Sequence, residues 1–377
     1  MLTLLLTAAS LALGGESPPP VVPPETLGSP KTVFAGTVTA FKASRLYLGD
    51  GRILEPGVLI VNDGIITRVG GDLEIPSGAA LIEHEGCITP GLIALHSTDG
   101  VGAELSDTTR VALPDADASH AFQPLDHDFA RARAAGITAL VLAPSITSLV
   151  GGQSTVVKTH GGTIVKRGAH LALGLSSDAL NSGRFPTSYD GALGELKRLF
   201  SDPEGPIARA VAGNLPVLMA VNTRAETRRA LRFAAEFQLK GALYGSTWAE
   251  DLSLEIGESG LAVICDPFDV GDSARSVRAV LALAKAGVPF GFGLDAPGRH
   301  PDCLRFGAAL CVRAGLDPQV ARRALTSDAA SIAGVAGRIG RLARGLDADL
   351  VLWSADPIQL TSSVEAVYID GQRVTQH

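Results

Sequence analysis

The chain has 377 residues, of which 46% are hydrophobic and 19% are charged, with a formal net charge of −7 at pH 7. A long, weakly charged chain can bury enough apolar surface to offset its ordering entropy, which excludes disorder for most of it. The 32 basic residues are scattered among 39 acidic ones without a basic stripe, so a nucleic-acid partner is excluded. The four cysteines form no CxxC pair, and we predict that they are buried free thiols: Cys87, Cys265, Cys303 and Cys311.

The first residues have the features of an export signal. Leu2 to Leu13 form a short apolar run that ends in small residues, although no Lys or Arg precedes it. We predict a signal peptide over residues 1–15 and an exported protein, periplasmic or extracellular; an apolar tail or a misplaced start codon is the alternative. Residues 16–30 are rich in proline and are predicted to be a stiff linker. No later apolar run reaches the ~20 residues of a membrane span, so we expect no span in the mature chain.

Two stretches, residues 31–88 and 336–377, have the pattern of β-structure. Short alternating runs are separated by turn pairs, such as Asp63-Gly64 in the first stretch and Asp370-Gly371 in the second. The simplest arrangement is one small β-sandwich domain that both ends of the chain build together.

Residues 89–335 alternate apolar, strand-like runs with helical patterns such as Arg224–Phe237, Ala274–Ala286 and Asp302–Ala314. Eight buried strands in about 245 residues predict an α/β fold, a (β/α)8 TIM barrel. A doubly wound sheet would usually need fewer strands, and no glycine-rich phosphate turn follows the first strand. The glycine pairs at 151–152 and 161–162 are predicted to be hairpin turns. The eight expected strands are Ile88–His96, Ile137–Ala143, Val156–Val165, Leu171–Leu175, Val217–Val221, Gly241–Tyr244, Leu261–Cys265 and Phe290–Leu294.

Five segments carry a resemblance to a known family. They are Ile88-Thr-Pro-Gly-Leu-Ile-Ala-Leu-His96, the stretch from Gly151 to Lys158, Ala286-Gly-Val-Pro-Phe-Gly-Phe-Gly-Leu-Asp295, the stretch from Gly337 to Trp353, and the stretch from Val367 to Val374. In this order they resemble the amidohydrolase superfamily, most closely its imidazolonepropionase-like members and an exported subgroup. The similarity runs from about Lys31 to Val374 and includes the composite β domain of metal-dependent hydrolases.

The resemblance implies a hydrolase that acts on carbon–nitrogen bonds other than peptide bonds. It also implies one or two divalent metals at the barrel mouth, held by two histidines of the first strand, histidines after the fifth and sixth strands, and an aspartate after the eighth. A bound metal lowers the pKa of water from about 15.7 towards ~7, which makes hydroxide available at neutral pH. The aspartate can then pass the proton of that water to the leaving nitrogen.

This sequence keeps only part of that set. His96 and Asp295 are the candidate catalytic residues and the candidate metal ligands, whereas Thr98, Asn222 and Tyr244 stand where the resemblance implies histidines. A catalytic zinc typically takes three protein ligands, and two donors are too few. We therefore predict no resident cofactor; if a metal binds, a divalent ion such as zinc is expected.

Two classes of function remain open at this point. The first is a hydrolase for a small-molecule amide, cyclic amides included, in which Asp295 is the general base and His96 orients it or acts as an acid. The second is a pseudoenzyme, a catalytically silent relative that keeps the barrel for binding or assembly. In that case His96 is a barrel histidine bonded to Asp295 or a hydroxyl, and Asp295 caps the turn before Pro297. His170, near the fourth strand, could replace a lysine ligand there.

Overall fold

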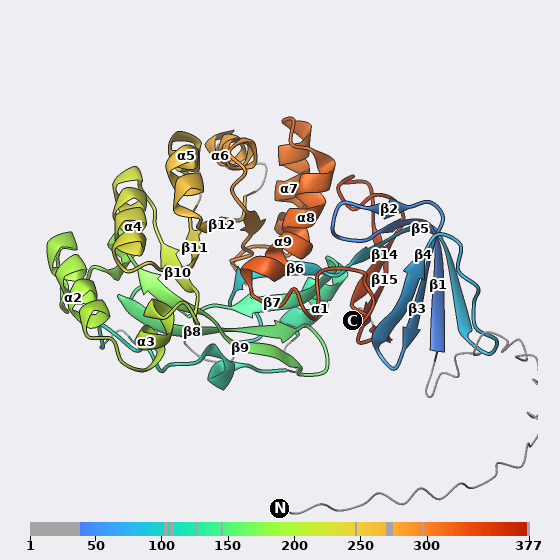
Figure 1. The fold of residues 1–377 in the computed structure, drawn as a ribbon, viewed down its shortest axis with the longest axis horizontal. Helices are drawn as coiled ribbons and strands as arrows, with labels where there is room; N and C mark the ends of the chain where they lie inside the picture. Colours follow the sequence, from blue (N-terminus) through green and yellow to red (C-terminus); the bar gives the residue numbers. More distant parts are fainter. Residues whose placement is uncertain are drawn as a thin grey trace, which may run out of the picture. The chain divides into compact units, whose positions relative to one another are not determined.

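The computed structural model describes residues 38–101, 105, 107, 109–124, 127–144, 146–245, 247–268, 274–295 and 298–374. These residues belong to one compact unit, Gly36–His377, which contains two eight-stranded sheets and a set of helices (Figure 1). The predicted signal peptide and linker lie outside the described residues.

Both ends of the described chain build the first sheet, which we call the sheet domain. Its strand order is β16-β15-β14-β5-β1-β3-β4, with β2 paired to β1. The central pair β1–β5 is parallel and the other neighbours are antiparallel. The strands are β1 (Val38–Tyr47), β2 (Ile53–Leu54), β3 (Gly57–Asn62), β4 (Ile65–Gly70), β5 (Ala80–Pro90), β14 (Leu350–Trp353), β15 (Val364–Ile369) and β16 (Gln372–Val374).

Two of the predicted turns are confirmed in this sheet. Asp63-Gly64 joins β3 to β4, with φ angles of 46° and 79°, and Asp370-Gly371 joins β15 to β16, with φ angles of 51° and 71°. A two-residue hairpin of this kind needs positive φ at both central positions, which Asp and Gly tolerate better than other residues. The turn chemistry therefore sets the register of both hairpins.

The second sheet forms a nearly closed barrel, as predicted. Its eight strands lie side by side in chain order, and the Leu294 N–H donates to the His96 carbonyl at 2.8 Å, which brings the last strand back to the first. The strands are β6 (Leu92–Ser97), β7 (Ile137–Leu142), β8 (Val150–Lys158), β9 (Ile164–Gly174), β10 (Val217–Ala220), β11 (Gly241–Tyr244), β12 (Ala262–Cys265) and β13 (Phe290–Phe292).

One strand departs from an all-parallel barrel. β8 runs antiparallel to both β7 and β9, and no described helix lies between these strands. The predicted strand Val156–Val165 is wrong: it covers the end of β8, a turn and the start of β9. Gly161 and Gly162, at φ 71° and 68°, make that turn as predicted, whereas the pair at 151–152 lies within β8. Apolar β-branched residues flank the turn on both sides. A prediction from composition alone therefore treats the two strands as one.

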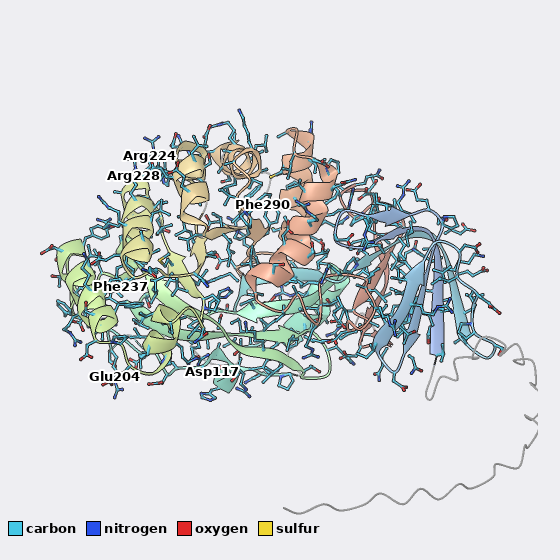
Figure 2. All side chains as sticks on the ribbon, viewed as in Figure 1. Asp117, Glu204, Arg224, Arg228, Phe237 and Phe290 are labelled. Atoms are coloured by element: carbon cyan, nitrogen blue, oxygen red, sulfur yellow. The ribbon has the colours of Figure 1, made fainter. Side chains whose placement is uncertain are left out.

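Most of the helices pack outside the strands. The expected helices after β10, β12 and β13 are confirmed, within two residues at their ends. On α4, Arg224 and Arg228 pair with Asp251 and Glu255 of α5, with Nε–oxygen distances of 2.8 and 3.1 Å (Figure 2). No described helix is long and apolar enough to cross a membrane. The helices are α1 (Asp128–Ala134), α2 (Tyr189–Ser201), α3 (Gly205–Val211), α4 (Arg224–Glu236), α5 (Ala249–Ser259), α6 (Ala274–Lys285), α7 (Cys303–Arg313), α8 (Pro318–Leu325) and α9 (Ser327–Ile332), with short 3-10 turns at Ala118–Ala121 and Ser177–Ala179.

Alternating residues of the strands divide the apolar core into two layers. On β10, Leu218 and Ala220 face the barrel interior, whereas Val217 and Met219 pack towards the helices. Ala329 and Ala330 of α9 join the interior cluster. The four cysteines are free and buried, as predicted.

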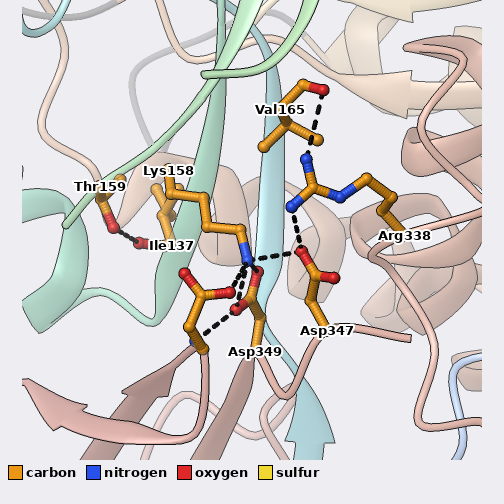
Figure 3. A network of polar contacts seen from close by, with 8 residues as sticks. Ile137, Lys158, Thr159, Val165, Arg338, Asp347 and Asp349 are labelled. Atoms are coloured by element: carbon orange, nitrogen blue, oxygen red, sulfur yellow. Dashed lines mark hydrogen bonds and ion pairs between the residues drawn. The ribbon is translucent and has the colours of Figure 1, made fainter. Parts of the chain in front are cut away.

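A buried charge network joins the barrel to the sheet domain. The Lys158 ammonium, at the end of β8, is fully buried and lies 2.8 Å from Asp347, 2.9 Å from Asp349 and 2.6 Å from Asp370 (Figure 3). Arg338 also donates to Asp347, at 2.7 Å. Burial alone would lower the pKa of Lys158, but the three carboxylates outweigh it and raise that pKa. The lysine is therefore held as a cation between the two sheets.

Candidate active site

A β-bulge turns His96 into the barrel. On β6, Ala94 pairs with Leu140 and Ser97 pairs with Leu142, so Leu95 and His96 lie together opposite a single residue of β7. Such a bulge changes the direction of one side chain in an otherwise regular strand. Leu95 belongs to the interior cluster, and the His96 ring stacks on Tyr244, another member of that cluster. Thr98 follows directly after β6 and is half-buried.

His96 and Tyr244 form a stacked pair at the carboxyl ends of β6 and β11. Their ring centroids are 4.0 Å apart and the ring planes differ by 10°. Each residue is only 8% exposed. Gly293 leaves the room for this pair, since a Cβ there would lie 3.3 Å from the His96 Cβ and 3.4 Å from the Tyr244 ring. Burial lowers the pKa of His96 to about 4, against a weaker opposing effect of Asp295, so the imidazole is neutral at physiological pH.

Asp295 lies beside His96, the other candidate residue. Its N–H donates to the His96 carbonyl at 3.1 Å. The residue has a φ of 53°, a left-handed conformation that Asp adopts more readily than most residues. Asp295 is exposed, whereas His96 is buried. Among the described residues, the Nδ1 atom of His96 has no hydrogen-bond partner.

Sequence reasoning missed a second carboxylate at this site. Asp266 directly follows β12, whose Cys265 pairs with Phe292 of β13, and it is half-buried. Burial raises the pKa of the Tyr244 phenol far above its ordinary value. The negative charges of Asp266 and Asp295 raise it further. The signal was available, because an acidic residue immediately after a buried parallel strand lies at the same barrel end as the other strand ends.

Asn222 lies after β10 but turns away from the buried pair. It is exposed, and its side-chain amide donates to Asp178 at 2.7 Å. Its backbone N–H donates to Glu226 at 2.7 Å. Glu226 is fully buried and also accepts from the N–H groups of Thr223, at 2.9 Å, and Ser177, at 3.0 Å. This carboxylate thus fixes the loops that follow β9 and β10.

His170 is not part of the site. It precedes Leu171, which pairs with the first residue of β10, so it lies near the amino ends of the strands. Its Nε2 is 2.8 Å from the Ile332 carbonyl and its Nδ1 is 3.3 Å from the Ser154 hydroxyl. The hypothesis that it replaces a lysine ligand at the mouth does not fit this position.

The donors at this site do not fit a resident catalytic metal. In the described part of the chain, no group of three or more His, Cys, Asp or Glu side chains is arranged to hold an ion. Tyr244 stacks on one face of His96, and the Asn222 amide is bound to Asp178. A catalytic zinc takes about three protein ligands plus water.

Part of the chain is similar to known proteins. Residues 238–374 match the Amidohydrolase family. The amidohydrolase tasK from Hapsidospora irregularis is 22% identical over an alignment that covers 84% of this chain and 39% of that protein, so the chain spans less than half of its relative. Residues 238–374 are therefore similar to the Amidohydrolase family.

Solved structures agree on the fold. The amidohydrolase from Thermotoga maritima MSB8 superposes with a TM-score of 0.81 at 24% identity, over 90% of this chain and 100% of that chain. A Xaa-Pro dipeptidase with bound methionine gives 0.57 at 13% identity, over 90% and 100% of the two chains. The A. niger ochratoxinase gives 0.57 at 17% identity, over 89% and 95%. The fold of this chain is therefore similar to the folds of these three solved structures.

Proposed function

We propose that this protein is a hydrolase of the amidohydrolase type that cleaves a carbon–nitrogen bond in a small amide, cyclic amides included. The observation that carries the proposal is the position of Asp295 beside His96 at the carboxyl ends of β13 and β6. In barrel enzymes the reacting groups lie at this end of the strands. The match to the Amidohydrolase family supports the reaction type.

The exposed Asp295 carboxylate is the general base in this proposal. It takes a proton from water as the water attacks the carbonyl carbon, and it returns that proton to the leaving nitrogen. His96 has no extra proton to donate at neutral pH, because burial lowers the pKa of its imidazole to about 4. In this proposal His96 positions the base, because its backbone carbonyl accepts from the Asp295 N–H at 3.1 Å.

A metal-free route is part of the proposal. Two strong donors, His96 and Asp295, are fewer than the three that a catalytic zinc takes. The test is elemental mass spectrometry on purified protein, where we expect less than one-tenth of an equivalent of zinc, manganese or iron. A near-stoichiometric metal that dialysis does not remove would contradict this part of the proposal.

A second candidate is a catalytically silent protein that binds a small molecule. The observation that favours it is the Tyr244 ring, which stacks on His96 and fills space inside the barrel end. Turnover separates the two candidates, because a silent protein binds an amide without consuming it.

The first testable prediction concerns Asp295. The wild-type chain is incubated with a panel of lactams, hydantoins and N-acyl amines, and new carboxylate and amine products are measured by mass spectrometry. We expect D295N to lower kcat by about 10²- to 10⁴-fold, because an amide cannot serve as the base. The matched control is D72N, an exposed aspartate in the sheet domain, which should keep full activity. Turnover that survives in D295N would rule out Asp295 as the base.

A further inference from the structure

Tyr244 has a hydroxyl group that the proposed mechanism does not yet use. It is the last residue of β11, its ring belongs to the barrel interior, and it is 8% exposed. Among the described residues, this side chain makes its contacts through the ring, and its hydroxyl is not one of the buried polar atoms that lack a partner. A phenol at the rim of a buried pair, open at its tip, can donate a hydrogen bond to a ligand.

We infer that the Tyr244 hydroxyl is the hydrogen-bond donor that polarises the carbonyl oxygen of the substrate. This inference rests on the proposed function, since it assigns a role within the same site. The placement supports it: β11 carries Tyr244, the neighbouring β12 leads to Asp266, and β13 leads to Asp295. When water held by Asp295 attacks the carbonyl carbon of the substrate, the phenol of Tyr244 therefore lies at a nearby strand end, two strands away.

The reaction balances with these groups alone. One O–H bond of water breaks and its proton goes to the Asp295 carboxylate, while the new C–O bond forms and the carbonyl π pair moves onto oxygen. The phenol donates to that oxygen throughout and loses no proton. When the intermediate collapses, the C–N bond breaks and the Asp295 proton passes to nitrogen, so one amide and one water give one carboxylic acid and one amine.

Electrostatics at the site keep the phenol a donor. Burial, Asp266 and Asp295 all hold Tyr244 in its neutral, protonated form by raising its pKa. The two carboxylates would oppose a negative charge on the substrate oxygen as well. That cost is limited, because Asp295 has become neutral by taking the proton of water when the oxygen acquires its charge.

The direct test is a binding experiment with a labelled amide. 2-Pyrrolidinone with a ¹³C carbonyl is added to wild-type protein and to Y244F, and its carbonyl band is followed by difference infrared spectroscopy. Y244F keeps the ring and the stack on His96 and removes only the hydroxyl. We expect a bound band shifted to lower frequency in the wild type, and a loss of that shift in Y244F. The matched control is Y368F, which changes a tyrosine that is similarly buried, at 6% exposed, but lies in β15 of the sheet domain.

Kinetics give the second readout. On an amide that the wild type hydrolyses, Y244F should lower kcat by about 10²- to 10³-fold with a small change in KM, as for loss of one oxyanion donor. An equal carbonyl shift in wild type and Y244F, or no bound amide in the wild type, would overturn the inference. A wild type that shows the shifted band but never turns the amide over would contradict the proposed function while supporting the donor role.

Discussion

At the scale of single residues, burial decides the charge of the two histidines inside the barrel. His96 and His170 are both buried, and burial is the largest cause that lowers the pKa of each from 6.5 to about 4. His170 is held by the Ile332 carbonyl and the Ser154 hydroxyl, with no carboxylate among these partners. A protonated ring would therefore lack compensation in the folded state.

This predicts a loss of stability in mild acid. Below pH 6.5 the unfolded chain binds protons at these rings and the folded chain does not, so the free energy of unfolding falls as pH drops towards about 4. Each histidine contributes a slope of up to about 1.4 kcal/mol per pH unit. Urea unfolding at pH 7, 6 and 5 should show a smaller slope in H170Q than in the wild type.

Two controls isolate this effect. H160Q changes an exposed histidine in the turn between β8 and β9, so it should keep the slope of the wild type. Burial raises the pKa of Asp349 to about 6, which makes stability rise as pH falls, but this contribution is the same in both proteins and cancels in their difference. Equal slopes in H170Q and the wild type would show that folding does not lower the pKa of His170.

The sequence predicted part of the site at this scale. The resemblance to amidohydrolases made His96 and Asp295 the candidate residues, because they stand at matching positions after the first and eighth strand runs. It did not predict the stack of His96 on Tyr244, since that contact depends on a one-residue bulge that no composition signal marks.

At the scale of elements, Glu226 determines how α4 begins and where the loop before it lies. Thr223 and Glu226 form a capping box at the start of α4. The buried Glu226 carboxylate also accepts from the Ser177 N–H and from the Tyr189 hydroxyl, and these contacts lower its pKa although burial alone would raise it. One carboxylate therefore fixes three chain segments.

Replacing this carboxylate with an amide should be costly. In E226Q, one side-chain NH₂ group faces backbone N–H donors, so buried donors are left unsatisfied and the fold should lose about 2–3 kcal/mol. The measurement is the free energy of unfolding in urea. E250Q, which changes a glutamate paired with Arg278 at the surface, should stay within about 0.5 kcal/mol of the wild type. A stable E226Q would mean that the loops are fixed by other contacts.

Helices and strands were predictable where the local pattern is unambiguous. α4 spans Arg224–Glu236 and α6 spans Ala274–Lys285, within one residue of the predictions, because amphipathic periodicity and the Thr223 cap mark their limits. The hairpin of β8 and β9 was not predicted as two antiparallel strands. Its direction depends on which neighbours pair, and that is a tertiary property.

At the scale of the whole molecule, Lys158 joins the barrel to the sheet domain. Its partners Asp347, Asp349 and Asp370 lie about 190 to 210 residues further along the chain, and the ammonium is fully buried. The segments around Lys158 and around Asp347 both contributed to the family resemblance, but their meeting could not be read from local pattern. Long-range pairing of this kind needs the folded topology.

Removing this cation should destabilise the fold. K158M leaves the carboxylates of Asp347 and Asp349 buried without their ammonium, and breaking a buried ion pair on one side costs about 3–5 kcal/mol. Thermal and urea unfolding measure the loss. K197M removes an exposed lysine paired with Glu236 and should cost less than about 1 kcal/mol. If K158M unfolds like the wild type, the network does not stabilise the junction.

The antiparallel β8 also bears on how the barrel assembles. Parallel neighbours such as β9 and β10 meet only after a long crossover through α2 and α3. β8 and β9 need only a five-residue connection, residues 159–163, to pair along their length. Since the entropy of loop closure grows with loop length, this hairpin is the cheapest strand pairing in the barrel to form. We therefore expect the β8–β9 hairpin to form early in folding, before the parallel strand pairs that are distant in sequence.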